Sequence, residues 1–539
     1  MIRRPALALL AVWTLLVACA KRETPAPPQQ PPAPVVDAGP RTGGRLIRRL
    51  ETDVNTLNYV LQSLEDERQV LQYIYDPLID FDANLEPIPG TAAKWEIADG
   101  GKTYVLHIDP RAVFSDGTPV TADDVVFTLH KILDEDSIQF ASWFEGLDRE
   151  HTQAVDAKTV RVAFREARVA QLLSFNIGVL PKHVYEKGNF KKNTKVIGNG
   201  PYVLARRETG KSFLLERNEK YWREKPYIDT VLFRIIADDA VAWSALKRGD
   251  IHAMQLENDI WFRAKDDPEV SARITFHDSY QLIYNCWPWN LTDPLFNDVR
   301  VRRAMAMALD RQSVIDKLYH GQARPLSGPF TPDSWANNPR VQPIEFNPQG
   351  ASALLSSAGW RDSDGDGILD RDGKKFAFTL LIPTGNKTSN DQSQIYQDAL
   401  RRLGVQMEIN ALDGAAFFER VLGGNFQAAM MAWSADPDPD PYSLFHSSQQ
   451  PPNGLNIVHY VNPEVDQLLE AGRTTFDHAR RTEIYHQLHE ILAADQPYLW
   501  TLQVGVKWAI DKRVQNVRSA KGLGLFLWNP GPFGWWLKE

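Results

Sequence analysis

Cysteine is scarce in this sequence, with two residues, Cys19 and Cys286, in a chain of 539. If the Cys19 thiol is covalently modified, Cys286 is the single free cysteine. No intrachain disulfide can then form, and no cysteine cage for a metal ion can be built. Cys286 lies in an apolar run, Leu282–Trp287, where we expect a buried, inert thiol rather than a nucleophile. A basic excess is also missing, because the net charge is −8. That balance argues against a nucleic-acid partner, which needs a clustered basic face.

Long apolar runs and the common catalytic motifs are absent as well. No run after residue 18 approaches the roughly 18 apolar residues that cross a membrane. A nucleophile elbow, a zinc-protease helix, a phosphate loop and a dinucleotide loop cannot be found. His486 and His489 stand three residues apart on an expected helix, and without a carboxylate at ligand spacing we interpret them as surface histidines. The sequence offers no persuasive catalytic constellation, and we expect no cofactor.

What the sequence does contain begins with a leader. Two arginines precede an apolar run of 13 residues, Ala6 to Ala18, which suits a signal peptide over residues 1–18 and is too short to span a bilayer. The run ends in Leu-Val-Ala-Cys, which resembles the lipobox of bacterial lipoproteins, so we expect Cys19 to be lipidated. An ordinary signal peptide with a chance cysteine is the alternative. Residues 19–42 are rich in proline and are expected to form an extended tether.

The roughly 500 residues after the leader suggest two or three domains. Alternating apolar residues predict strands within 101–114, 155–164 and 201–216. Thr121, with Asp124 three residues later, is typical of a helix N-terminus. A helical apolar pattern runs from Asp298 to Tyr319 and stops before Gly321.

Residues 376–433 alternate between strand and helix patterns. Strands are expected at 376–382, 405–409 and Phe426–Trp433, with helices at 395–403 and 417–422 between them. This order predicts an α/β fold with a mixed or parallel sheet covered by helices. Ligands of such sheets bind beyond the carboxyl ends of the strands, so the loop from Trp433 to Tyr442 is the first candidate site.

An aspartate-rich segment is the one metal-like pattern. Asp362, Asp364, Asp366 and Asp370 match the first nine positions of an EF-hand-type calcium loop. Position 12, which should supply a bidentate glutamate, is Gly373. We therefore favour a plain polar turn over a calcium site and expect no bound metal.

Six ordered segments then point to a family. The chain resembles the extracytoplasmic solute-binding proteins of ABC importers, family 5, which includes oligopeptide-, dipeptide- and nickel-binding proteins. The resemblance covers essentially all of residues 44–539. It rests on Trp95–Leu133, Gly198–Tyr202, Glu216–Asp250, Phe296–Gly321, Ala353–Lys374 and Trp433–Phe445.

The resemblance implies a periplasmic-binding-protein-like fold of type II, cluster C, in which two lobes close on a ligand and an extra domain is inserted. Domain I is expected to be discontinuous, over 43–86, 197–278 and 505–539. Domain II is expected over 87–196, and domain III over 279–504.

The resemblance also implies a function: a monomeric lipoprotein, anchored on the periplasmic side of the membrane, that captures a solute and delivers it to an ABC permease. A short peptide is the expected ligand. An oligosaccharide or another small molecule is the alternative, and a secreted hydrolase a more distant one.

The family's peptide binders meet the ligand's α-ammonium with an aspartate in the loop after the last strand of domain III. Asp436 matches that position, and Trp433 would wall the pocket. The alternative role for Asp436 is to cap the turn with Pro437. Asn285, Trp287 and Tyr442 are the remaining candidate ligand-binding residues.

Overall fold

The computed structural model describes residues 39–135, 137, 140–452 and 454–538. The expected signal peptide, Cys19 and most of the tether lie outside these residues. Arg41–Glu539 form one compact unit. Within the described ranges, none of the helices combines the length and apolar character needed to cross a membrane.

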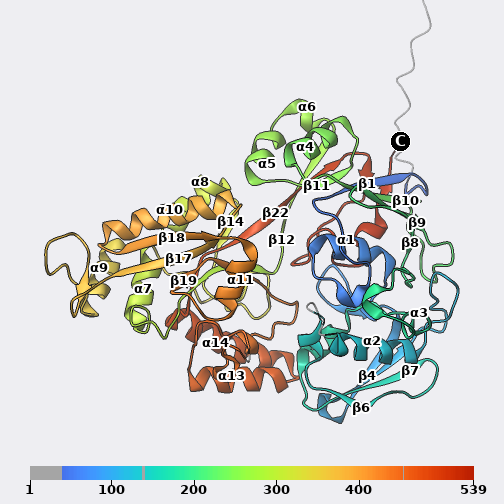
Figure 1. Ribbon diagram of the computed structural model, residues 1–539, viewed down its shortest axis with the longest axis horizontal. Coiled ribbons are helices and arrows are strands. Elements are labelled where there is room, and N and C mark those ends of the chain that lie inside the picture. The colour runs from blue at the N-terminus through green and yellow to red at the C-terminus, as the bar shows by residue number, and fades with distance from the viewer. Residues whose placement is uncertain (1–38, 136, 138–139, 453, 539) are drawn as a thin grey trace, which may run out of the picture. The chain divides into compact units, whose positions relative to one another are not determined.

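A large mixed sheet is assembled from distant parts of the chain (Figure 1). Its eight strands follow the order β12-β22-β11-β1-β10-β9-β8, with β14 paired to β22 outside this path. β1 runs parallel to β10 and β11, and the other pairs are antiparallel. The strands are β1 (Arg45–Leu50), β8 (Tyr202–Glu208), β9 (Ser212–Arg217), β10 (Thr230–Ile235), β11 (Ala253–Gln255), β12 (Ile274–Tyr280), β14 (Ala323–Pro325) and β22 (Leu502–Asp511); helices α1 (Glu65–Ile74), α4 (Asp239–Arg248), α5 (Asn258–Lys265) and α6 (Pro268–Ser271) accompany them.

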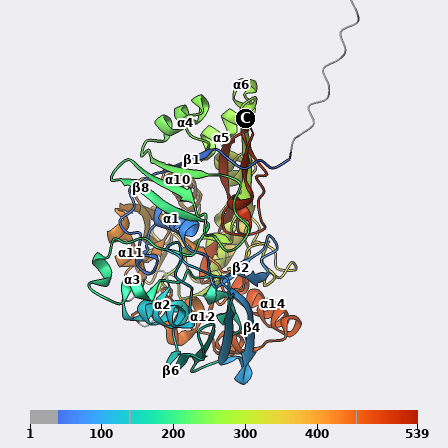
Figure 2. The same cartoon turned by 90° about the vertical axis from the view of Figure 1, so that its right-hand side faces the viewer.

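A four-stranded antiparallel sheet, in the order β4-β5-β7-β6, is built from local sequence. Its strands are β4 (Ala92–Ala98), β5 (Thr103–Ile108), β6 (Leu147–Ala154) and β7 (Thr159–Phe164), and α2 (Ala122–Asp134) lies beside them (Figure 2). The expected helix N-terminus is confirmed: the Thr121 hydroxyl accepts from the amide of Asp124, and the Asp124 carboxylate accepts from the amide of Thr121. The hairpin β2 (Ile79–Phe81) and β3 (Pro87–Pro89) precedes this sheet, and α3 (Lys182–Tyr185) follows it.

The expected parallel α/β unit is confirmed. β17 (Ala377–Pro383) pairs in parallel with β18 (Gln406–Leu412) and with β19 (Ala428–Ala429). The crossovers are α10 (Lys387–Arg402) and α11 (Gly414–Leu422), and Figure 1 shows α10 lying along this sheet.

Three expectations about this half of the chain were wrong in detail. The run Phe426–Trp433 forms two strands of different sheets, because β20 (Met431–Ser434) pairs with β13 (Ile283–Pro288) and not with β17. The pattern 298–319 is two helices, α7 (Val299–Ala308) and α8 (Arg311–Tyr319), since the Asp310 side chain caps the second. His489 is fully buried: its Nδ1 accepts from the amide of Asn338, so its Nε2 donates to the Ser327 hydroxyl.

The main core residues form two groups. One apolar cluster contains residues between 46 and 253 and between 508 and 535, which we call the first lobe. Two further clusters lie between 284 and 502, which we call the second lobe. β22 joins the lobes, because Leu502 belongs to a second-lobe cluster and Ile510 to the first-lobe cluster. The remaining elements are α9 (Pro348–Ser357), α12 (Tyr442–Phe445), α13 (Pro463–Thr474), α14 (His478–Asp495), β15 (Asp370–Arg371), β16 (Lys374–Lys375), β21 (Tyr498–Trp500), β23 (Val514–Gln515) and β24 (Trp536–Leu537).

Candidate ligand-binding site

A cavity of about 760 Å³ lies where the two lobes face each other. First-lobe segments between residues 59 and 81, 140 and 176, and 522 and 533 form one wall. Residues 281–283, 434–438, Asp440, Ser443 and Arg473 form the other. Its volume is within the range of about 300 to 1,000 Å³ that is usual for small-ligand sites.

The loop after β20 brings three aspartates to this cavity, and two of them are already paired. Asp438 receives a two-pronged contact from Arg481 of α14, with Nη1 2.8 Å from Oδ2. Asp440 lies 2.8 Å from Nε of Arg473 at the end of α13. Asp436 also lines the cavity, and no described residue donates a hydrogen bond to its carboxylate or forms an ion pair with it. The loop therefore presents one carboxylate without a cation.

The surroundings of Asp436 oppose its charge. Its side chain is exposed in this conformation and lines the cavity together with residues of the facing first-lobe wall. The loss of bulk water raises the pKa of Asp436 to about 6, and the negative charges of Asp440 and Asp438 add to this effect. Once a ligand displaces the cavity water, the carboxylate needs a cationic partner or a proton.

Eight aromatic side chains line the first-lobe wall. Tyr59 stacks on Phe140 with ring centroids 5.3 Å apart, and Phe140 meets Trp143 edge-on. Such rings offer apolar surface to a ligand side chain and negative faces to a cation. The aromatic lining residues are Tyr59, Tyr75, Phe81, Phe140, Trp143, Phe526, Trp528 and Phe533.

Comparison with known proteins decides the family. Residues 86–455 match the profile of the bacterial extracellular solute-binding proteins, family 5 Middle. The chain belongs to this family. It is 30% identical over 493 residues to the oligopeptide-binding protein AppA of Bacillus subtilis (strain 168), covering 89% of this chain and 90% of AppA. It is 26% identical to the dipeptide-binding protein of Escherichia coli (strain K12), covering 82% and 86%.

Solved structures agree on the two-lobe α/β fold. The structure of B. subtilis AppA in complex with a nonapeptide superposes with a TM-score of 0.77 at 28% identity, over 93% of this chain and 100% of that one. NikZ from Campylobacter jejuni in complex with Ni(L-His) gives 0.78 at 25% identity, over 92% and 99%. Members of this family bind solutes outside the cytoplasm for ABC importers and are not enzymes.

Of the five candidate ligand-binding residues of this solute-binding protein, Asp436 alone lines the cavity. Trp433 directly precedes Ser434, which lines the cavity. Because successive side chains of a strand point to opposite faces, Trp433 faces away from the cavity and packs against the second-lobe core. Asn285 donates from Nδ2 to the carbonyl of Leu502 at 2.9 Å.

Trp287 and Tyr442 have structural surroundings as well. Trp287 is 1% exposed and packs edge-on against Tyr396. Tyr442 stacks on His446, and the guanidinium of Arg473 lies 4.0 Å from its ring centroid. Tyr442 thus orients Arg473, which lines the cavity, without lining it itself.

The aspartate-rich segment holds a cation of its own. The ammonium of Lys375 lies 2.6 Å from Asp364 and 3.0 Å from Asp366, with Asp370 at 3.9 Å. Asp362 accepts from the amides of residues 365 and 367. Oxygens of Asp362, Asp364 and Asp370 lie within 4.8 Å of one another, but a lysine supplies the positive charge that calcium would bring.

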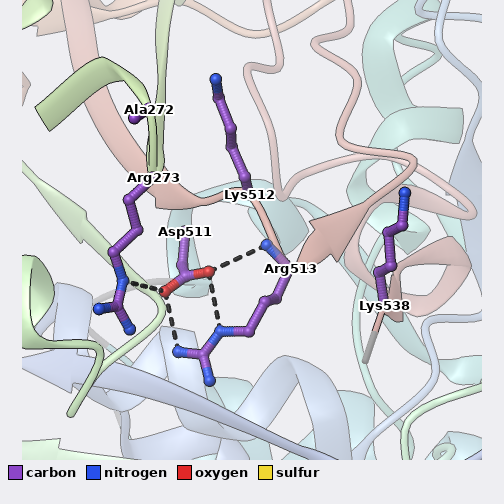
Figure 3. A pocket seen from close by; sticks show the side chains of 6 residues that line it. All are labelled: Ala272, Arg273, Asp511, Lys512, Arg513 and Lys538. Atoms are coloured by element: carbon purple, nitrogen blue, oxygen red, sulfur yellow. Dashed lines mark hydrogen bonds and ion pairs between the residues drawn. The ribbon is translucent and has the colours of Figure 1, made fainter. Parts of the chain in front are cut away.

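A second cavity of about 410 Å³ lies at the first-lobe surface (Figure 3). Its carboxylate, Asp511, is held by Arg513 through both oxygens and by Arg273 at 3.4 Å. The other lining residues are Ala272, Lys512 and Lys538. With its acid already paired and no aromatic wall, it offers a ligand much less than the cavity between the lobes.

The sequence did not identify the first-lobe wall. Its residues are separated by more than 450 positions, from Tyr59 to Phe533, and long-range packing alone brings them together. The one sequence feature that could have indicated this wall is the high content of aromatic residues in 526–536. The expectation for Cys286 is confirmed, since the thiol is buried and burial raises its pKa.

Proposed function

We propose that this protein captures a short peptide between its lobes and delivers it to an ABC permease in the membrane. The unpaired carboxylate of Asp436 is the observation that carries the proposal. A peptide's α-ammonium supplies a compact cation with three donors, which matches a carboxylate that has no cationic partner in the cavity. Asp438 and Asp440 are excluded from this role because arginines already neutralise them.

The relatives support a peptide over a sugar. AppA and the dipeptide-binding protein are named for peptides. An oligosaccharide could stack on Tyr59 or Trp143, but its hydroxyls bring no charge, and Asp436 would stay uncompensated in the filled cavity. A peptide satisfies both the carboxylate and the aromatic wall.

The proposed machinery has three domains. Except for β14 (323–325), the large sheet takes its strands from 45–50, 202–280 and 502–511, which supports a discontinuous domain I over 43–86, 197–278 and 505–539. The four-stranded sheet supports a domain II within 87–196, and the second-lobe cores support a domain III over 279–504. The lobes would close about β22, which reaches both cores.

We also propose that the protein works as a monomer tethered to the membrane through lipidated Cys19. The apolar run before Cys19 and the proline-rich residues 19–42 support this. Labelled palmitate should enter the wild-type protein, and Cys19→Ser should be released from membranes. A Cys19→Ser protein that stays membrane-bound would contradict the anchor.

Asp436→Asn tests the proposed ammonium contact. It removes one charge while keeping the shape of the side chain. We expect calorimetric affinity for alanine tripeptide and pentapeptide to fall by more than about tenfold, because a charge-assisted hydrogen bond is lost in a confined site.

The matched control is Glu408→Gln, which removes one charge from an exposed position of β18 outside the cavity. Both variants should unfold at wild-type temperatures or above. If folded Asp436→Asn binds the peptides with unchanged affinity, Asp436 does not contact the ligand's α-ammonium.

A further inference from the structure

The cavity between the lobes carries more negative charge than a single ammonium can balance. Seven carboxylates line it, and five arginines lie within ion-pair distance of them. Asp80 and Asp436 have no ion-pair partner among the described residues. The five pairs are Glu65–Arg68, Asp76–Arg223, Glu145–Arg168, Asp438–Arg481 and Asp440–Arg473.

The second excess charge lies on the first-lobe wall, where Asp76 and Asp80 line the cavity four residues apart. Asp80 accepts only from neutral donors, the side chain of Asn529 at 2.8 Å and the amide of Phe81. Asp76 accepts from the Tyr221 hydroxyl at 2.7 Å, while Arg223 stays 3.8 Å away, beyond hydrogen-bond reach. Among the described residues, Arg223 is thus the one cation within ion-pair distance of these two carboxylates, and it reaches only Asp76.

Burial opposes the charged form of both carboxylates on this wall. Burial raises the pKa of Asp76 to about 7 although Arg223 opposes the shift, and burial raises the pKa of Asp80 as well. A ligand that brings a cation to this wall would stabilise both carboxylates in their charged form.

The wall around Asp80 also keeps a polar atom without a partner. Gln62 lines the cavity and is 3% exposed, and its Oε1 accepts no hydrogen bond. Tyr59, Gln62 and Asp80 all line the same cavity, and burial raises the pKa of the Tyr59 hydroxyl to about 12. A buried carbonyl oxygen without a donor is costly, and a ligand N–H would satisfy it.

The aromatic rings of this wall suit a long cationic side chain. Lysine and arginine lay their methylene stems along apolar surface and keep the charged group at a polar end. Tyr59 and Phe81 offer such surface within a few residues of Gln62 and Asp80.

We infer that the first-lobe wall takes a basic side chain of the ligand, so that the cavity favours cationic peptides, with Asp80 as the specificity-determining residue and Asp76 beside it. The inference rests on the proposed peptide-binding function and adds the class of peptide. The ligand carboxylate would be received by Arg168. Its present partner, Glu145, is 71% exposed and 3.5 Å away, so it can move into water without loss.

A peptide series tests the charge preference without altering the protein. Alanine tripeptides and pentapeptides carry lysine, norleucine or glutamate at each position in turn, and calorimetry gives each affinity. At one position lysine should bind about tenfold more tightly than norleucine, which has nearly the same stem without the charge, and glutamate should bind more weakly than either.

Asp80→Asn tests the assigned residue, with Glu408→Gln as the matched control. We expect the advantage of lysine over norleucine to fall below about threefold in Asp80→Asn and to persist in the control. Equal binding of lysine and norleucine peptides to wild type at every position would overturn the inference while leaving peptide binding intact. A full lysine advantage in Asp80→Asn would overturn the role of Asp80. If no peptide of any charge bound, the proposed function would fall, and the inference with it.

Discussion

Asp436 should make peptide binding depend on pH within the physiological range. Its pKa in the ligand-free protein is raised to about 6, and only the ionised form attracts an ammonium. As pH falls from 7.5 to 5, the ionised fraction should drop about tenfold, and affinity for an alanine peptide should drop with it. Calorimetry across this range measures the slope.

The control for this prediction is Asp436→Asn. Asp76, with a pKa of about 7, and Asp80, whose pKa burial also raises, line the same cavity, so the variant's remaining pH dependence reports these two residues. A wild-type profile no steeper than that of Asp436→Asn would show that Asp436 does not meet the ligand's cation.

The same raised pKa affects folding stability in the opposite direction: binding should improve as pH rises, whereas stability should fall. The folded protein binds a proton at Asp436 between pH 4 and 6 more readily than the unfolded chain does, so this residue lowers stability as pH rises through about 6. Asp436→Asn should therefore unfold at a higher temperature than wild type at pH 7.5, with the difference fading by pH 4.5. Because water in the cavity screens the charge, we expect a gain below about 1 kcal/mol. A lower unfolding temperature at pH 7.5 would contradict this.

At the scale of elements, the turn 362–375 is expected to depend on its lysine. In Lys375→Met, four carboxylates stay close together without a cation, so unfolding temperature should fall at low salt and recover at high salt. Millimolar calcium should raise the unfolding temperature of the variant more than that of wild type, since the ion would take the place of the ammonium. Thermal unfolding with calcium, with magnesium and without either measures this.

The neighbouring Lys374→Met variant is the matched control, because Lys374 is exposed and forms no ion pair among the described residues. An equal calcium response in both variants would mean that the carboxylate cluster is not what binds the ion.

Local patterns predicted the elements better than their partners. The capping box at Thr121 and the strands of 376–409 depend on neighbouring residues, and both were confirmed. The run Phe426–Trp433 was apolar throughout, but apolar character does not say which strand lies beside it. β19 pairs with β17 and β20 with β13, because the chain changes sheets at Met430.

At the scale of the whole molecule, the sequence pointed to one wall of the candidate cavity and not to the other. The rule that ligands sit beyond strand ends led to the Asp436 loop, which does line the cavity. Two of the three aspartates in this loop are neutralised by Arg473 and Arg481. These arginines belong to the later helices α13 and α14, so the loop sequence alone does not reveal the pairing. The first-lobe wall, with Asp80 and Gln62, forms only when distant parts of the first lobe, from Tyr59 to Phe533, pack together.

A contact between the lobes outside the cavity should contribute to ligand affinity. Phe476, between α13 and α14, lies against Gly101, in the turn between β4 and β5: a Cβ at Gly101 would stand 2.0 Å from its Cζ. A contact that forms only when the lobes meet favours the closed state, and the ligand's affinity includes that gain. Losing about 50 Å² of apolar contact in Phe476→Ala should weaken peptide binding about fivefold or more.

The unfolding temperature of ligand-free Phe476→Ala should stay near that of wild type, because the ring is 43% exposed even in this conformation. Phe418→Ala is the matched control, since Phe418 is 52% exposed on α11 and does not line the cavity. Calorimetry gives the affinities, and small-angle scattering with and without peptide gives the compaction. If Phe476→Ala binds and compacts like the control, the lobes do not separate at this contact, and closure must be confined to the walls that carry Asp80 and Asp436.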